Sequence, residues 1–171
     1  MIHADLPSVP SFYKGYVDNV KDHDLYDILQ KSNDEFLEVV NGISEELGEH
    51  CYAEGKWSIK ELLCHMQDAE RIFAYRALRF ARNDKTPLSG FEEKDYAPQA
   101  NAHSRTVSDI GKELKRLRDS TIDLFKSFSP EMLRRTGTAN NTLISVLNLG
   151  FIIPGHETHH RKVLTERYLK R

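Results

Sequence analysis

The densest group of reactive side chains in this 171-residue chain is a run of histidines near its C-terminal end. Of eight histidines in all, three stand at positions 156, 159 and 160, within the segment GHETHHR. Side chains four residues apart on a helix point about 40° from each other. His156 and His160 could therefore present two imidazoles to one metal ion. His156 and His159, three residues apart, are the competing pair, and the spacing does not choose between them.

A fourth histidine, His65, falls on or beside the apolar stripe of an earlier predicted helix. Neutral imidazoles inside a helical bundle lose hydration unless they find a polar partner, and a metal ion is one such partner. Three histidine ligands also leave a coordination position open for water or substrate, as catalytic metal sites do. The same spacing also suits a hydrogen-bonded histidine patch with no metal. The remaining histidines fall in predicted termini or loops and are expected to be solvated: His3, His23, His50 and His103.

Four amphipathic segments would have to position these side chains. Apolar residues recur at steps of three and four over residues 24–47, 58–82, 106–128 and 141–169, which predicts four helices. Ser58 and Glu61 form a capping-box pattern, Thr106 is a similar start, and Ser129-Pro130 opens a shorter helix. Pro154 predicts a kink near Ile153. We find no alternating strand pattern.

These segments predict an all-α protein, a four-helix bundle in one domain spanning residues 1–171. The link at residues 49–57 suits antiparallel neighbouring helices. By contrast, residues 83–105 form an unusually long connection that contains Pro87, Gly90 and Pro98. This connection could return the chain along the bundle, so that the second and third helices run parallel. Phe91 and Tyr96 within it could wall a substrate pocket.

Composition excludes several classes of function. The 24 basic and 26 acidic residues nearly cancel, so no overall field favours nucleic acid, and no nucleic-acid partner is expected. The most apolar run, residues 147–153, is too short to span a bilayer, and the first residues lack a secretory signal. We therefore expect a cytoplasmic protein with no membrane partner.

Cys51 and Cys64 match no zinc or redox spacing, and Cys64 is expected to be a small buried hydrophobe.

The sequence resembles the DinB/YfiT-like superfamily of metal-dependent enzymes over nearly its whole length. The resemblance runs from the pattern Pro10-x-x-Tyr13-x-x-Tyr16 to Arg167-Tyr168-Leu169. Its most specific stretches are GKWSIKELLCHMQDAERIFAYRALRFARNDKTPLSGF (55–91), RRTGTAN (134–140) and GFIIPGHETHHRKVLTERYL (150–169). This resemblance implies an up-down-down-up bundle with a long crossover between its second and third helices. It also implies that His65, His156 and His160 are metal ligands, which selects the pair spaced by four, and that the protein is a homodimer.

The resemblance further implies chemistry that uses a low-molecular-weight thiol such as bacillithiol, mycothiol or a glutathione-like compound. Our leading hypothesis is a metal-dependent transferase that joins such a thiol to a small electrophilic substrate. Zinc or nickel suits the three histidines best, and iron, cobalt or manganese are also compatible. The alternatives are a metal-dependent hydrolase and a non-catalytic metal-binding protein of a stress response. Asp68 is a candidate to orient His65, whereas Glu157 is expected to be solvated.

Overall fold

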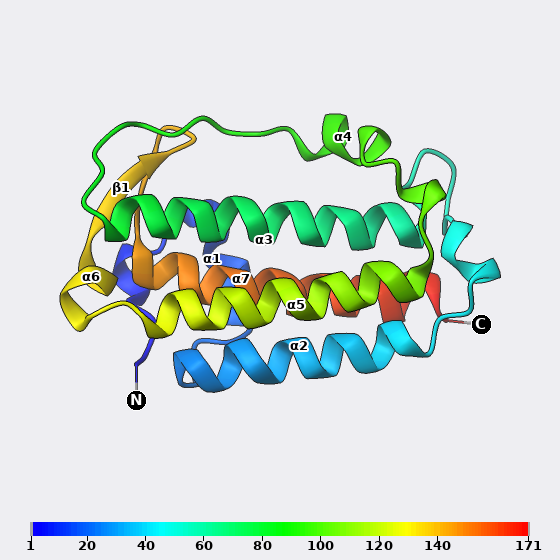
Figure 1. Ribbon diagram of the computed structural model, residues 1–171, viewed down its shortest axis with the longest axis horizontal. Coiled ribbons are helices and arrows are strands. Elements are labelled where there is room, and N and C mark those ends of the chain that lie inside the picture. The colour runs from blue at the N-terminus through cyan, green and yellow to red at the C-terminus, as the bar shows by residue number, and fades with distance from the viewer. Residues whose placement is uncertain (1, 171) are drawn as a thin grey trace.

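The computed structural model describes residues 2–170, and its dominant feature is a set of long helices that lie alongside one another (Figure 1). These helices are α2 (Leu25–Asn41), α3 (Ile59–Ala81), α5 (Val107–Lys126) and α7 (Val146–Val163). They fall within the four segments that the apolar periodicity predicts. The last of them continues as a turn of π-helix, Leu164–Tyr168.

Shorter elements lie at the ends and along the outside of this bundle (Figure 1). The α-helical ones are α1 (Lys14–Asp18), α4 (Glu93–Tyr96) and α6 (Pro130–Arg134). Turns of 3-10 helix span Leu6–Ser8, Ser11–Tyr13, Glu46–Glu49, Ala97–Gln99 and Ala102–Ser104. Two short strands, β1 (Thr136–Ala139) and β2 (Thr142–Ser145), pair antiparallel, with Thr136 opposite Ser145.

Side-chain caps fix where the long helices start. The Ser58 hydroxyl accepts a hydrogen bond from the Glu61 backbone N–H, while the Glu61 carboxylate accepts one from the Ser58 N–H, which completes the predicted capping box. Thr106 caps α5 in the predicted place, and Asp24, at the start of the first predicted segment, caps α2. These local bonds satisfy N–H groups that have no partner inside the helix.

The prediction that no strand occurs is wrong. The two strands are joined by Asn140 and Asn141, whose φ angles are 49° and 57°. Paired left-handed residues form the tight turn that suits a two-residue hairpin, and asparagine tolerates that conformation. The hairpin occupies the predicted start of the last helix, so α7 begins only after Ser145, whose hydroxyl caps it. The helix then continues without interruption through Pro154.

The long helices run in up-down-down-up order (Figure 1). Helices α2 and α3 each pack against both α5 and α7, which places α2 and α3 diagonally in the bundle. They are antiparallel, as expected, but they are not the neighbours that their short link suggested, because residues 42–58 carry the chain across the end of the bundle. The connection after α3 returns along its outside, so α3 and α5 are parallel (Figure 1).

The bundle interior has three zones along its length. One apolar cluster lies at the hairpin end and includes Phe80, Phe125 and Phe151. A second cluster lies at the opposite end and includes Phe36 and Leu63. Between them lies a layer of buried polar side chains, among them Ser32, Asn33, Gln67, Glu70, Arg118, His156 and Glu157. Because buried polar groups need partners, this middle zone is where a site is expected.

Candidate metal centre

Three imidazoles meet in the middle of the bundle. His65 comes from α3, and His156 and His160 come from α7. The Nε2 atom of His156 lies 3.2 Å from that of His65 and 3.1 Å from that of His160. The three ligand atoms all lie within 4.8 Å of one another, which makes this group a candidate metal site.

The spacing of these nitrogens fits a metal ion. Tetrahedral zinc with Zn–N bonds near 2.05 Å would hold its nitrogens about 3.3 Å apart. The observed separations of 3.2 and 3.1 Å for His65–His156 and His156–His160 are close to that value. The donor set of three imidazoles suits zinc, nickel, iron or cobalt, and leaves room for a further ligand.

Burial keeps the three imidazoles in the neutral form that can bind a metal. It lowers the pKa of His65 to about 4. Burial, together with the neighbouring imidazoles, lowers the pKa of His160 to about 3 and that of His156 well below its ordinary value. Protons therefore do not compete for these nitrogens near pH 7.

The competing histidine does not join the group. His159 is exposed, and its ring lies edge-on to those of Tyr16 and His160, with ring centres 5.4 and 5.0 Å away. The structure thus brings together the pair spaced by four residues, His156 and His160, with His65.

Tyr16, on the N-terminal helix α1, covers the candidate metal site and was not among the predicted site residues. Its ring lies edge-on to that of His156, with centres 5.2 Å apart. A Cβ atom added to Gly155 would lie 2.2 Å from the Tyr16 carbonyl oxygen, so only glycine allows α1 to approach α7 this closely. Burial raises the pKa of the Tyr16 phenol, and the charge of Glu93 adds to that shift. The only sequence signal for this contact was the Tyr13-x-x-Tyr16 pattern.

The expectation that Glu157 is solvated is wrong. Only 1% of its surface is exposed, and its carboxylate accepts hydrogen bonds from Ser32 (2.7 Å), Asn33 (3.0 Å) and Arg118 (2.8 Å). Helix α7 packs against α1, α2 and α3 at once, so the side of the helix that a simpler bundle would leave in water is covered here. Burial raises the pKa of the Glu157 carboxyl, and the Arg118 guanidinium opposes that shift.

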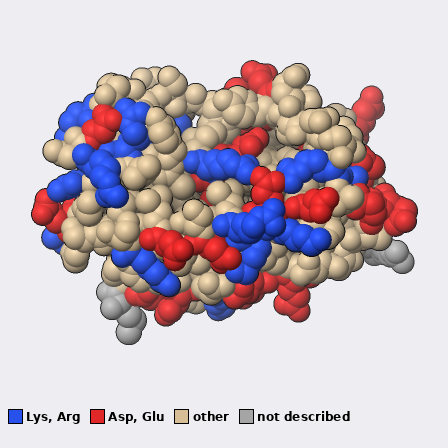
Figure 2. All heavy atoms as spheres, viewed as in Figure 1, with Lys and Arg blue, Asp and Glu red and all other residues tan. Residues whose placement is uncertain are grey.

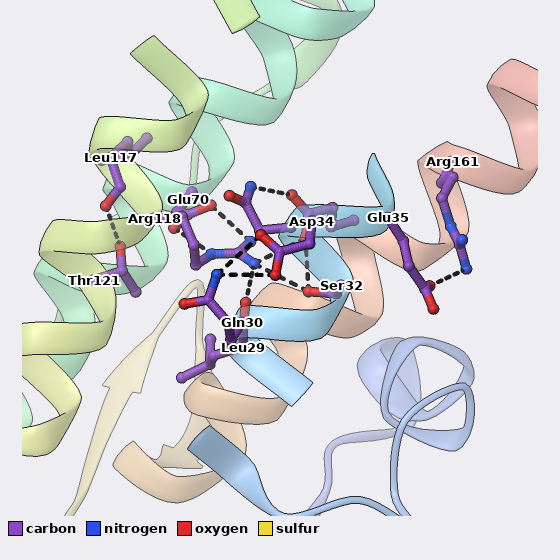
Figure 3. A network of polar contacts seen from close by, with 12 residues as sticks. Leu29, Gln30, Ser32, Asp34, Glu35, Glu70, Leu117, Arg118, Thr121 and Arg161 are labelled. Atoms are coloured by element: carbon purple, nitrogen blue, oxygen red, sulfur yellow. Dashed lines mark hydrogen bonds and ion pairs between the residues drawn. The ribbon is translucent and has the colours of Figure 1, made fainter. Parts of the chain in front are cut away.

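Arg118 joins the two helices that carry the histidines, and Figure 3 shows it beside Glu70, Leu29 and Ser32. Its guanidinium binds both carboxylate oxygens of Glu70 on α3 at 2.9 Å, and it also donates to Glu157 on α7. Further hydrogen bonds go to the Leu29 carbonyl and the Ser32 hydroxyl on α2. Burial acts to lower the pKa of Arg118, but the carboxylates of Glu157 and Glu70 outweigh it, so the pKa is raised. Because Glu157 directly follows His156, this cation helps to set the separation of α3 and α7 at the metal centre.

The other candidates have different roles. Asp68 forms an ion pair with Arg71 at 3.7 Å, and within residues 2–170 it makes no hydrogen bond to His65. Cys64 is buried as expected, and burial raises the pKa of its thiol, which keeps it neutral. His103 is exposed and bonds to Glu49.

Two open spaces border the three histidines, which are called the histidine triad below. A small chamber of about 70 Å³ is lined by His65, His156, Tyr16, Glu93 and Arg76, together with Phe12, Tyr13, Ala69, Phe73, Phe91 and Asn140. A larger cleft of about 590 Å³ is lined by His160, Trp57, Lys56, Lys94 and Glu93, together with Tyr52, Gly55, Glu61, Leu62, Pro98, His159, Val163 and Tyr168. The triad therefore faces both spaces, and Glu93 borders both.

The crossover supplies part of the walls. Phe91 lines the chamber as expected, whereas Tyr96 lines neither space and instead packs on Phe91, with ring centres 5.4 Å apart. The crossover is fixed to the hairpin because the Leu88 N–H donates to the Thr138 carbonyl at 2.9 Å and the Leu88 carbonyl accepts from Asn140 at 3.0 Å. The unexpected hairpin thus holds the crossover over the site.

The outer surface shows no single dominant charge. On the face drawn in Figure 2, basic and acidic side chains are interspersed over the middle of the molecule, and one basic group lies at the hairpin end. Within the described chain, no helix combines the length and the apolar character that crossing a membrane would require.

Sequence comparison identifies the family. A model described as the DinB superfamily matches residues 28–164, a span that includes all three histidines. The chain belongs to the DinB superfamily. Among relatives, it is 27% identical over 125 residues to a protein of Oceanobacillus iheyensis named "Putative metal-dependent hydrolase OB0413", covering 72% of this chain and 71% of that one.

Solved structures agree with this bundle. YfiT of Bacillus subtilis, described as "a probable metal-dependent hydrolase with an unusual four-helix bundle topology", superposes with a TM-score of 0.74 at 16% identity, over 83% of this chain and 82% of that chain. A mycothiol-dependent maleylpyruvate isomerase superposes with a TM-score of 0.66 at 14% identity, over 82% of this DinB-superfamily chain and 60% of the isomerase. These likenesses confirm the four-helix fold. With the histidine cluster, the set of relatives fits a metal-dependent enzyme.

Proposed function

We propose that this protein is a metal-dependent enzyme that transfers a low-molecular-weight thiol to a small electrophile. The observation that carries the proposal is the position of the three histidines between two spaces: His65 and His156 face the chamber, and His160 faces the cleft. Two reactants held on either side would meet at the triad.

The chain's own residues would hold the metal through the Nε2 atoms of His65, His156 and His160. A bound divalent metal would lower the pKa of a thiol or water beside it, which makes a nucleophile available at neutral pH. Tyr16 and the buried wall around His156 limit access of bulk water from the α1 side.

The larger cleft suits the thiol. Its volume of about 590 Å³ is in the range of small-molecule sites. Lys56 and Lys94 line it and can pair with the carboxylates that glutathione-like thiols carry, and Trp57 offers an apolar face. Glu93, which borders both spaces, is placed to accept the proton that the thiol loses.

Hydrolysis is the second candidate, because the Oceanobacillus relative and YfiT are both described as hydrolases. In that reaction water takes the place of the thiol, and the smaller chamber is large enough for it. The same histidines and Glu93 would serve both reactions.

The experiment is a turnover assay on metal-loaded protein with an electrophilic aryl halide and an activated ester, each with and without added bacillithiol or glutathione. Conversion that needs the thiol, and that is lost in His160→Ala, supports thiol transfer. Ester cleavage at the same rate without thiol would favour hydrolysis. Metal binding without turnover of either probe would contradict both reactions and leave a metal-binding protein.

A further inference from the structure

Arg76, on α3, is a buried cation that forms no ion pair with an Asp or Glu side chain of residues 2–170. Only 3% of its surface is exposed. Within residues 2–170, no Asp or Glu oxygen lies within 4.0 Å of its guanidinium, whereas the other buried arginine, Arg118, has two carboxylate partners. A buried charge without a counter-ion is unfavourable, so its presence beside a candidate site needs a reason.

The Arg76 guanidinium is held in a defined position. One nitrogen, Nη2, donates to the Ser89 carbonyl at 2.9 Å, and the Cζ atom lies 6.0 Å from the centre of the Phe73 ring. Ser89 follows Leu88, which is bonded to the hairpin, so its carbonyl is fixed as well. This contact occupies one of the five N–H donors that a guanidinium carries.

The remaining nitrogens of the Arg76 guanidinium are not sealed inside the protein. Arg76 is one of the residues that line it. Among described residues, the buried polar side-chain atoms that lack a partner belong to Asn33, Asn148 and His160, and none belongs to Arg76. The other nitrogens of this buried arginine therefore still reach open space, and the chamber that Arg76 lines is the space that we infer they reach.

The same chamber reaches the metal centre. The Phe73 ring, 6.0 Å from the Arg76 Cζ atom, is also 6.0 Å from the centre of the His156 ring. One small molecule can thus contact Arg76 at one end and the histidines at the other. The chamber of about 70 Å³ has room for about two water molecules at their volume in the liquid, or for the carboxylate end of one small organic acid.

We propose that Arg76 binds the carboxylate of a small carboxylic acid whose reactive carbon lies at the histidine triad. This inference rests on the proposed function and names the class of its electrophilic substrate. Ala69, Phe73 and Phe91 supply apolar walls for the carbon skeleton. The planar fork of a guanidinium matches a carboxylate in shape and charge.

A carboxylate fits this chamber better than a phosphate group. Glu93 is the one acidic side chain among the lining residues described, and it would repel a doubly charged phosphate more than a singly charged carboxylate. The donor already committed to Ser89 also leaves fewer N–H groups for the three oxygens of a phosphate.

The test is an NMR titration of zinc-loaded, 15N-labelled protein with propionate, with the isosteric neutral propionamide, and with inorganic phosphate. The Arg76 side-chain Nε–H signal, assigned by its loss in Arg76→Lys, should shift on addition of propionate. We expect propionate to bind at least tenfold more tightly than propionamide, and Arg76→Met to abolish that preference. Arg82→Met is the matched control, because Arg82 lies at the end of the same helix, is exposed and does not line the chamber.

Three results would overturn the inference: equal binding of propionate and propionamide, a preference that survives in Arg76→Met, or tighter binding of phosphate. If Arg76→Met does not fold, the Nε–H shift in the unaltered protein still decides the question. Zinc content, measured on the same sample, separates the two proposals. Metal binding without an acid preference contradicts only the role of Arg76, whereas failure to bind zinc, nickel or ferrous iron contradicts the proposed function.

Discussion

His65, His156 and His160 keep their imidazoles neutral through burial, and this has a consequence for stability. In the unfolded chain a histidine titrates near pH 6.5, but in the folded protein the pKa of His65 is about 4 and that of His160 is about 3. At a pH between the folded and the unfolded pKa of such a histidine, the unfolded chain binds more protons than the folded one. The metal-free protein should therefore lose stability as the pH falls from 6.5 toward 4, by up to roughly 3 kcal/mol for His65 alone.

This can be measured by urea unfolding of metal-free protein at pH 7.5, 6, 5 and 4.5. His65→Phe should flatten the pH dependence, while His3→Phe, at an exposed histidine outside the site, should not. An unchanged free energy of unfolding from pH 7.5 to 4.5 would contradict the burial of neutral imidazoles.

Gly155 allows α1 to pack closely against α7 beside the histidines. In Gly155→Ala the new methyl group would overlap the Tyr16 carbonyl, so α1 must move away from α7. We expect a loss of about 1–3 kcal/mol in the free energy of unfolding and a displaced Tyr16 ring. Thermal unfolding would measure the loss of stability, and the NMR signals of the Tyr16 ring, assigned by their loss in Tyr16→Phe, would report its displacement. Gly15→Ala is the control, because a Cβ added at Gly15 meets open space. Equal stability of the two variants would show that the close contact is not required.

At the scale of elements, Arg118 holds α3 and α7 in position relative to each other, and its substitution tests that role. Arg118→Met would leave Glu70 and Glu157 buried without their shared cation. Removal of one partner from such a network typically costs about 3–5 kcal/mol. Because the same cation joins the helices that carry the triad, metal affinity should also fall.

A variant that combines Arg118→Met with Glu70→Gln and Glu157→Gln separates the effect on stability from the effect on metal affinity. It removes the unpaired charges, so it should recover part of the stability without recovering the metal affinity. Unaltered metal affinity in Arg118→Met, with the protein folded, would contradict the positioning role.

Local signals account for what could be predicted about the elements. Apolar periodicity and the caps at Asp24, Ser58 and Thr106 act within one or two turns, so the helix starts could be read from the sequence. The hairpin was missed because each strand has only four residues and its pairing depends on the left-handed Asn140 and Asn141.

The errors at the site have a different origin. Glu157 was misjudged because its partners Ser32, Asn33 and Arg118 lie 125, 124 and 39 residues away in sequence. Arg76 carries no motif, and only the fold shows that it is buried. The three histidines could be selected as a set because the family resemblance decided between His159 and His160, which spacing alone could not.

At the scale of the whole molecule, the metal should contribute to folding stability. The triad joins α3 to α7, and any ligand that binds only the folded state stabilises it in proportion to its affinity and concentration. Addition of zinc at a hundred times its dissociation constant should raise the free energy of unfolding by about 2.7 kcal/mol. Differential scanning calorimetry with zinc and then with excess chelator would measure the rise and its reversal; an unchanged Tm would contradict zinc binding to the native state.

We also propose that the protein is a homodimer, as its resemblance to the DinB/YfiT-like superfamily implies. Phe12, which lines the chamber, is 77% exposed, so a partner that covers it would also narrow access to the site. Light scattering should give twice the chain mass of 19.7 kDa, and Phe12→Ser should lower that mass if this surface is the interface. The mass of a single chain at all concentrations would contradict the dimer.

The central claim is that His65, His156 and His160 bind one metal ion, and the most direct test is metal content by mass spectrometry on protein purified without a histidine tag. The account predicts about one equivalent in the unaltered protein and in His159→Ala, and loss of metal in His65→Ala, His156→Ala and His160→Ala. Retention of metal in any of these three would show that the histidine concerned is not an essential ligand. If the unaltered protein takes up no metal after exposure to zinc, nickel and ferrous iron, the claim is wrong.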